Sequence, residues 1–329
     1  MTNDRPFGGA LDLANSRLGG KAVAASDDFF AAKERINDPA DPVFIADKYD
    51  DNGKWMDGWE SRRRRDAGHD WCVIRLAARG RLLGAEFDTR HFTGNYAPAA
   101  QLEGCVSDSE IPGADAVWTP LTPAITLNGD ERREVAIEAD APVTHVRLNI
   151  YPDGGVARLR LFGVPDIDWS ARDAGERMDL ASALNGARVI ACNDEHFGRL
   201  ANILAPGRGV NMGDGWETRR RREPGADWGL IELARPGRIE EILIDTAHFK
   251  GNFPDRCSLQ AIGGADVPAE ALIAQSLFWP MLLPEQKMTA DAEHRFTSKI
   301  LSHEPVRYIR LNLAPDGGVS RLRLFGRAS

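Results

Sequence analysis

The chain has 329 residues, of which 43% are hydrophobic and 27% charged, and its formal net charge is −8. This composition is typical of a soluble globular protein, and the acidic balance argues against a nucleic-acid partner. No apolar run is long enough to cross a membrane, and the start MTNDRPFGGALDL lacks the features of a secretory signal. The four cysteines form no CxxC pair, so we expect reduced thiols in a cytoplasmic protein.

The first twenty residues show no counterpart later in the chain and are expected to form an N-terminal arm. Five blocks then occur twice, in the same order. They are SDDFF (26–30) and NDEHF (193–197), DGWESRRRR (57–65) and DGWETRRRR (214–222), DWCVIRL (70–76) and DWGLIEL (227–233), FDTRHFTGNY (87–96) and IDTAHFKGNF (244–253), and VRLNIYPDGGVARLRLFG (146–163) and IRLNLAPDGGVSRLRLFG (309–326). This pattern indicates a duplication, with one repeat at 21–163, a linker with a short helix at 164–186, and a second repeat at 187–329.

Each repeat is predicted to be all-β. In VRLNI, the apolar residues Val146, Leu148 and Ile150 alternate with Arg147 and Asn149, which is the period of a strand with one buried face. The PDGG that follows predicts a tight hairpin to VARLRLF. DWCVIRL and RLLGAEF read as two strands joined by a turn, and helical periodicity is confined to SDDFFAAKERI and the linker. Many short strands with Gly/Pro turns favour a jelly-roll β-sandwich in each repeat, and the block order resembles galactose-binding jelly rolls of the discoidin type.

Familiar catalytic signatures such as GxSxG, HExxH or a Gly-rich phosphate loop are missing, so polar residues present in both repeats are the candidates. The most unusual are the two runs of four arginines. If they lie in strands, two arginines of each run share a face and could bind a small carboxylate; the alternative is a solvated edge strand. The predicted substrate-binding members are Arg62, Arg64, Arg219 and Arg221.

A second shared motif, D-T-x-H-F-x-G-N, places an acid, an imidazole and an amide in one loop. It contributes Asp88, His91 and Asn95 in the first repeat and Asp245, His248 and Asn252 in the second. Such a loop could perform general acid/base chemistry and orient a polar substrate, with Asp88 fixing the tautomer of His91. The alternative is a turn in which the polar side chains only cap backbone groups.

Three further sets remain open. Glu60 and Glu217 precede the arginine runs and could act as a base or as counter-ions. Several aspartates could cap turns or ligate a divalent cation through oxygen: Asp27, Asp28, Asp57, Asp194 and Asp214. The outward residues of the predicted hairpin form a solvated face or face an anion: Arg147, Asn149, Arg158 and Arg160, repeated as Arg310, Asn312, Arg321 and Arg323. Arg158 and Arg321 are the predicted substrate-binding members of this last set.

These motifs resemble the allantoicase family over nearly the whole chain, from about Gly20 to Gly326. The resemblance rests on SDDFFA, DGWESRRRR, the HDW at His69, FDTRHFTGN and the twofold RLNxxPDGGVxRLR. It implies two jelly-roll modules that convert allantoate and water to ureidoglycolate and urea. Arginine suits the substrate carboxylate, and a general acid and base suffice for loss of urea without an acyl intermediate.

The two repeats differ where His69, Arg90 and Tyr96 of the first become Ala226, Ala247 and Phe253 of the second. Two equivalent sites are therefore not expected, and His91 is favoured over His248. The rival hypothesis is a non-catalytic double jelly roll that binds a small ligand or a carbohydrate. A duplicated chain also leads us to expect a homo-oligomer.

Overall fold

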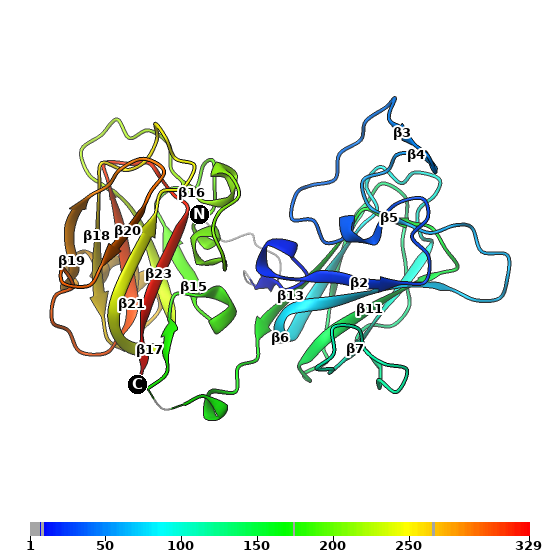
Figure 1. Ribbon diagram of the computed structural model, residues 1–329, viewed down its shortest axis with the longest axis horizontal. Helices are drawn as coiled ribbons and strands as arrows, with labels where there is room; N and C mark the ends of the chain where they lie inside the picture. Colours follow the sequence, from blue (N-terminus) through cyan, green and yellow to red (C-terminus); the bar gives the residue numbers. More distant parts are fainter. Residues whose placement is uncertain (1–6, 8–9, 174, 265–266) are drawn as a thin grey trace. The chain divides into compact units, whose positions relative to one another are not determined.

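The computed structural model describes residues 7, 10–173, 175–264 and 267–329. The chain divides into two compact units, Met1–Ile167 and Asp168–Ser329. Each unit is built from antiparallel strands, as the ribbon in Figure 1 shows. The all-β class predicted from the alternating pattern is confirmed, with two jelly-roll β-sandwiches in tandem.

The first unit consists of short strands around one long strand, β6. Its elements are β1 (Leu11–Asp12), η2 (Ser16–Leu18), β2 (Lys21–Ala25), η3 (Lys33–Arg35), β3 (Tyr49–Asp50), β4 (Gly53–Lys54), β5 (Trp59–Glu60), β6 (Asp70–Asp88), β7 (Ala99–Cys105), β8 (Thr119–Pro120), β9 (Ile125–Thr126), β10 (Arg132–Ala136), β11 (Val143–Tyr151), β12 (Gly155–Val156) and β13 (Arg158–Pro165).

Strand β6 joins the two layers of the first sandwich. Its first residues pair with β2 and β11, whereas its last residues pair with β10 and β13. The register with β11 shifts between Arg75 and Gly80, the position of a β-bulge. A bulge bends and twists a strand, so one strand can serve both layers. The Ala/Arg/Gly stretch that predicted a turn between two strands is this bulge, and that prediction was wrong.

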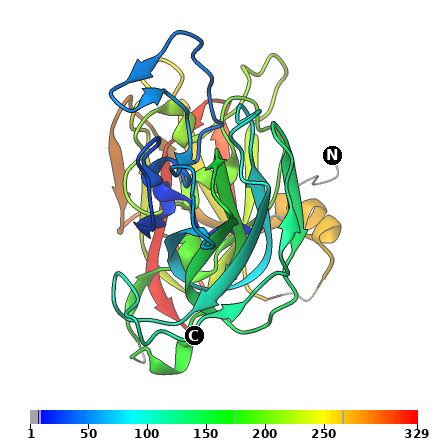
Figure 2. The ribbon, with the colours of Figure 1, turned by 90° about the vertical axis from the view of Figure 1, so that its right-hand side faces the viewer.

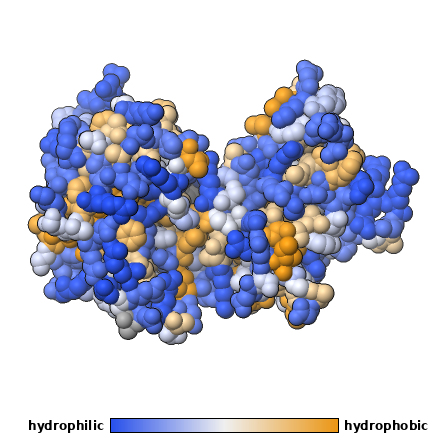
Figure 3. Space-filling model, in the orientation of Figure 1, coloured by the Kyte–Doolittle hydropathy of each residue, from blue (hydrophilic) through white to orange (hydrophobic). Residues whose placement is uncertain are grey.

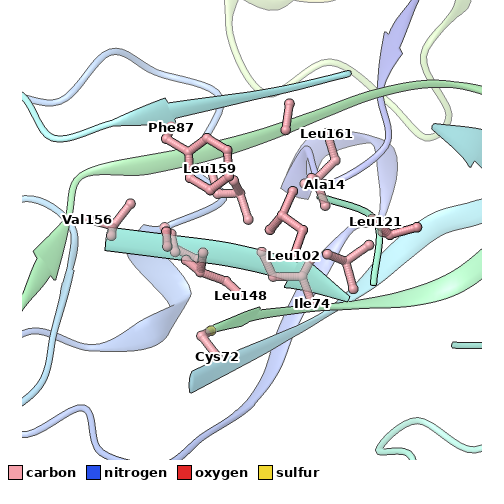
Figure 4. Packing of buried hydrophobic residues seen from close by; sticks show 14 of the residues in the cluster. Ala14, Cys72, Ile74, Phe87, Leu102, Leu121, Leu148, Val156, Leu159 and Leu161 are labelled. Atoms are coloured by element: carbon pink, nitrogen blue, oxygen red, sulfur yellow. The ribbon is translucent and has the colours of Figure 1, made fainter. Parts of the chain in front are cut away.

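Between the layers lies an apolar core. Phe87, Leu159 and Leu161 come from β6 and β13, while Leu102 and Leu148 come from β7 and β11. Their side chains point toward one another in Figure 4. Burying a side chain of this size contributes roughly 1.5–3 kcal/mol, so these alternating residues hold the layers together. The other face of the same strands is left for polar residues.

The second unit repeats this plan in the order β14-β23-β17-β21-β18-β19. Its elements are η4 (Trp169–Ala171), β14 (Arg177–Asp179), η5 (Ala183–Asn185), β15 (Arg188–Cys192), η6 (Leu200–Leu204), η7 (Met212–Asp214), β16 (Trp216–Glu217), β17 (Asp227–Asp245), β18 (Arg256–Ile262), α1 (Ala269–Gln275), η8 (Ser276–Phe278), β19 (Met281–Lys287), β20 (Glu293–Phe296), β21 (Val306–Ala314), β22 (Gly318–Val319) and β23 (Arg321–Ala328). Helix α1 is visible at the edge of this unit in Figure 2.

The predicted PDGG hairpin is wrong in both units. Strands β11 and β13 do not pair with each other; both pair with β6, on different parts of its length. The connection between them contains β12, which pairs with β5 instead. Alternation showed correctly which side chains face the core, but it does not specify the neighbouring strand. The helical pattern in SDDFFAAKERI corresponds only to the three-residue turn η3, and the predicted linker contains two such turns, η4 and η5.

The expected N-terminal arm and linker differ from the structure at their inner ends. Residues Leu11–Asp12 pair with β13, and Arg177–Asp179 pair in the same way with β23. Asp12 accepts the N–H of Leu161, and Asp179 accepts that of Leu324. These segments are therefore strands of their units. They form a further pair of equivalent segments in the two repeats, which the short LD and MD sequences are not long enough to reveal. Residues 1–6 and 8–9 of the arm lie outside the described residues.

Among the described residues, no helix has the length and apolar character required of a membrane span. The face seen in Figure 3 is mainly hydrophilic, with apolar side chains scattered over it.

Candidate active site

The arginine runs lie in loops that lead into β6 and β17, not in strands. Alternate arginines of each run are nevertheless held by internal carboxylates. Arg62 contacts Asp27 at 2.6 Å, and Arg64 contacts the buried Asp70 at 2.8 Å. In the second unit, the corresponding ion pairs are Arg219–Asp194 at 2.7 Å and Arg221–Asp227 at 2.8 Å. The four arginines predicted to bind substrate are thus the ones whose charge is already compensated.

The remaining arginines of each run are exposed. Among the described residues, Arg63, Arg65, Arg220 and Arg222 form no ion pair. In the second unit this loop borders a cavity of about 420 Å³, whose lining includes Arg220, Arg222 and Asn193. Guanidinium groups are the donors best suited to a small carboxylate. The members of each run that form no ion pair are therefore the alternative candidates for the anion site predicted at this loop.

Glu60 lies at the end of β5, next to the arginine run. Asn95 donates its side-chain N–H to Glu60 Oε1 at 2.8 Å. Burial raises the pKa of the Glu60 carboxyl, and the Asn95 hydrogen bond only partly opposes this effect. In the second unit, Asn252 donates to Glu217 in the same way. A carboxyl that holds its proton to higher pH is suited to donate it to a leaving group.

Asp27 shows the opposite behaviour. Burial alone would raise its pKa, but the backbone N–H and the guanidinium of Arg62 hold the pKa below its ordinary range. Asp27 therefore stays ionised as a counter-ion, while Glu60 is the carboxyl biased toward the protonated form.

The histidines of the D-T-x-H-F-x-G-N loops take supporting positions. His91 and His248 both have φ of 71°, a left-handed conformation. Their ring Nε2 atoms lie 3.1 Å from the Pro42 carbonyl oxygen and 2.8 Å from that of Gly209, so the ring N–H donates to the backbone of a neighbouring loop. Asp130 accepts the His91 backbone N–H. These contacts anchor each loop to a neighbouring loop.

Asp88 does not orient His91, contrary to expectation. Its buried carboxylate accepts from the Arg90 guanidinium at 2.6 Å and from the Arg90 backbone N–H. Asp245 contacts Arg208 at 3.1 Å in the second unit. The reason is local geometry, because the tight turn after β6 directs residue 90 back over the carboxylate.

Arg158 and Arg321 are not on an open face either. The side chain of Arg158 is 1% exposed and donates to the carbonyl oxygens of Ala40 and Asp57 and to the Asp57 carboxylate at 2.9 Å. Arg321 contacts Asp214 in the same manner at 2.7 Å. The loop that precedes β5 covers the start of β13, so Arg158 anchors this loop to the sheet. Arg321 anchors the corresponding loop of the second unit through Asp214. Each side chain therefore holds a loop of its own unit, instead of standing on an open face.

The candidate cation-binding aspartates are likewise occupied by protein donors: Asp27 and Asp194 contact arginines of the runs, Asp57 and Asp214 contact Arg158 and Arg321, and Asp28 contacts Lys33 at 3.3 Å. Over the described parts of the chain, no group of three or more His, Cys, Asp or Glu side chains could hold a metal ion. Asn193, which also lines the cavity, was not among the predicted site residues. Its position in the sequence gives no indication that it lies close to the arginine run in the fold.

The fold and these loops define a duplicated jelly-roll protein with an arginine-rich loop and a carboxyl–amide pair in each unit. The family model described as "Allantoicase repeat" matches residues 11–166 and again 178–329. The chain belongs to the allantoicase family.

Individual relatives agree with this assignment. The chain is 57% identical to "Probable allantoicase 2" of Burkholderia pseudomallei, over 96% of this chain and 94% of that protein. It is 53% identical to "Probable allantoicase" of Stutzerimonas stutzeri, over 98% and 97%. The crystal structure of allantoicase from Saccharomyces cerevisiae superposes with a TM-score of 0.80 at 34% identity, covering 96% of this chain and 93% of that one. Both repeats take part in each match.

Proposed function

We propose that this chain hydrolyses allantoate to ureidoglycolate and urea in purine catabolism. The observation that carries the proposal is the match of the allantoicase repeat to both units, with 57% identity to a relative of that name over 96% of the chain. The arginine loops supply what this substrate requires, since allantoate is a small carboxylate.

The chemistry follows from substrate and product. Allantoate carries two ureido groups and a carboxylate on one carbon, and the product has a hydroxyl group where one ureido group was. The bond that breaks therefore joins the central carbon to nitrogen. The departing urea nitrogen takes up a proton, and the oxygen of water forms the new bond to carbon and releases a proton. One acid and one base suffice, and no covalent acyl-enzyme is required.

For the acid we propose Glu60 in the first unit. Burial raises its pKa, and the hydrogen bond from Asn95 fixes its position. His91 is less suited, because its ring N–H already bonds to Pro42. The substrate carboxylate pairs with Arg63 and Arg65, the exposed members of the same run. Glu217 is the matched residue of the second unit and serves as an internal control.

We also propose a cytoplasmic homo-oligomer. Support comes from Cys72, Cys105 and Cys257, which are buried free thiols, as suits a reducing compartment. A duplicated chain offers two related surfaces for symmetric assembly. Light scattering should give a multiple of the chain mass, and a species of single-chain mass at all concentrations would refute the oligomer.

The decisive experiment for the function incubates the purified full chain with allantoate and follows urea and ureidoglycolate. The control substrate is ureidoacetate, whose central carbon bears only one ureido group and therefore lacks the second nitrogen that assists departure of urea. We expect urea from allantoate and none from ureidoacetate. Absence of urea over about pH 6 to 9, with and without added divalent cations, would refute the proposal.

A further inference from the structure

The second unit has a cavity of about 430 Å³ on the outer face of its sheet. Strands β17, β18 and β21 supply most of its lining, including Trp228, Ser258, Gln260, Arg310 and Asn312. The outer face is polar because the alternate residues of β21, such as Leu311 and Leu313, fill the core. The volume suits a small molecule.

Arg310 is the unusual member of this lining. The residue is only 5% exposed, yet its hydrogen bonds go to neutral atoms: Ser276 Oγ at 2.6 Å and Asn312 Oδ1 at 2.8 Å. Its guanidinium also lies 4.6 Å from the Trp228 ring. Among the described residues, no carboxylate lies within ion-pair distance of it, and burial lowers its pKa below the ordinary value. A buried cation without an anion is costly unless a ligand supplies one.

The first unit shows how the same position can be closed. Arg147 corresponds to Arg310 and contacts Glu103 at 2.6 Å, directly across the strand pair. The residue across from Arg310 is Gln260, which is neutral. The Arg147 side chain is 29% exposed, so the more deeply buried of the two arginines is the one that lacks an acidic partner.

A second difference opens the space itself. In the first unit, His69 covers this face, with Nε2 3.3 Å from Asn149 Oδ1 and its ring centroid 4.9 Å from that of Tyr151. The second unit has Ala226 and Ala314 at the positions of His69 and Tyr151, and both alanines line the cavity. The second unit therefore lacks both the acidic partner of the arginine and the two rings that cover this face in the first unit.

The remaining lining residues suit amide recognition. Asn312 donates its side-chain N–H to Ser258 Oγ and to Gln260 Oε1. The side-chain N–H of Gln260 donates to the backbone oxygens of Leu277 and Trp279, so the group that Gln260 offers a ligand is its Oε1, which can accept a second hydrogen bond. The one carboxyl in the lining, Glu285, is exposed and bonds to Arg256 at 3.0 Å. No lining residue is therefore placed to transfer a proton to a ligand held at Arg310, so the site is suited to binding and not to catalysis.

We propose that this cavity binds a small carboxylate bearing a ureido or primary amide group, with its carboxylate on Arg310 and its amide on Gln260 and Asn312. The site lies in the second unit, where Arg221 of the arginine run also lines it, and the inference does not depend on allantoate turnover. It assigns a ligand-binding role to the second unit at a position that the first unit has closed.

The test is calorimetric titration of the full chain with ureidoacetate. Gln260→Glu introduces the counter-ion seen in the first unit and should remove one binding site per chain, or weaken it roughly 10- to 100-fold. Glu103→Gln is the matched variant; it frees Arg147 and should leave the Arg310 site intact. Arg310→Lys keeps the charge but loses the planar fork, so it should also weaken binding, and it decides the matter if Gln260→Glu does not fold.

Unchanged stoichiometry and affinity in folded Gln260→Glu and Arg310→Lys would overturn the proposal, as would absence of ureidoacetate binding to the unaltered chain. The turnover number with allantoate, measured on the same variants, should stay within a few-fold of the unaltered chain. Parallel loss of turnover and binding would overturn the non-catalytic assignment. If the unaltered chain binds ureidoacetate at Arg310 but releases no urea from allantoate, only the proposed function fails.

Discussion

Replacing Arg158 by Met should destabilise the first unit and leave substrate affinity unchanged. The substitution removes hydrogen bonds to the carbonyl oxygens of Ala40, Asp57 and Ala157 and leaves the Asp57 carboxylate without its cation. The Asp57 carboxylate keeps its hydrogen bond from the Val43 N–H. The loop before β5 nevertheless loses the contacts of Ala40 and Asp57 with Arg158 and is therefore held less firmly. Removing one member of a buried ion pair costs about 3–5 kcal/mol.

For a domain of this size, each kcal/mol lowers the melting temperature by about 2–4 °C, so we expect a fall of roughly 6–20 °C. Differential scanning calorimetry measures it, and Arg321→Met should act similarly on the second unit. Arg62→Gln is the control, because that side chain is 63% exposed and its ion pair should contribute at most about 1 kcal/mol. A normal melting temperature for Arg158→Met together with a raised KM for allantoate would refute the anchoring role.

Four further predictions concern the candidate site of the first unit. Glu60→Gln should lower kcat roughly 10²–10⁴-fold, and Glu217→Gln should change it little; comparable kcat in both variants would exclude Glu60 as the acid. Because burial raises the pKa of Glu60, the folded chain holds this proton more tightly than the unfolded chain. Its stability relative to Glu60→Gln should therefore fall as pH rises through and above the ordinary glutamate range. Urea denaturation measured at several pH values checks this, and a pH-independent difference would contradict it. His91→Asn should lower the melting temperature but keep kcat within a few-fold, since its ring holds the backbone at Pro42; a large loss of kcat at normal stability would restore the histidine as the acid. The double variant Arg63→Gln and Arg65→Gln should raise KM for allantoate roughly 10- to 100-fold with little change in stability, and an unchanged KM would remove the carboxylate from this loop.

The sequence predicted the duplication and the sandwich class because both depend on local patterns that the fold preserves. Alternation in VRLNI and RLRLF correctly separated core residues such as Leu148 and Leu161 from polar ones. Partnership between strands was not predictable, because β11 and β13 are close in sequence yet pair with different parts of β6. A Gly/Pro turn shows that the chain changes direction, not which strand it then joins.

The candidate site was predictable only as a region. The arginine runs are visible in the sequence, but which members are free depends on Asp27 and Asp70, which lie elsewhere in the chain. Outward-facing arginines look alike until a loop covers one of them, as happens to Arg158. The counter-ion missing from Arg310 likewise becomes evident only when the strands are aligned and Gln260 is found opposite.

The central claim is that this chain cleaves the bond between the central carbon of allantoate and a ureido nitrogen, with water supplying the new oxygen. Turnover in ¹⁸O-labelled water, with both products analysed at once by mass spectrometry, tests it most directly. The account predicts label in the hydroxyl group of ureidoglycolate and unlabelled urea. Release of ammonia and labelled carbon dioxide in place of urea would show attack at a ureido carbonyl and would contradict the account.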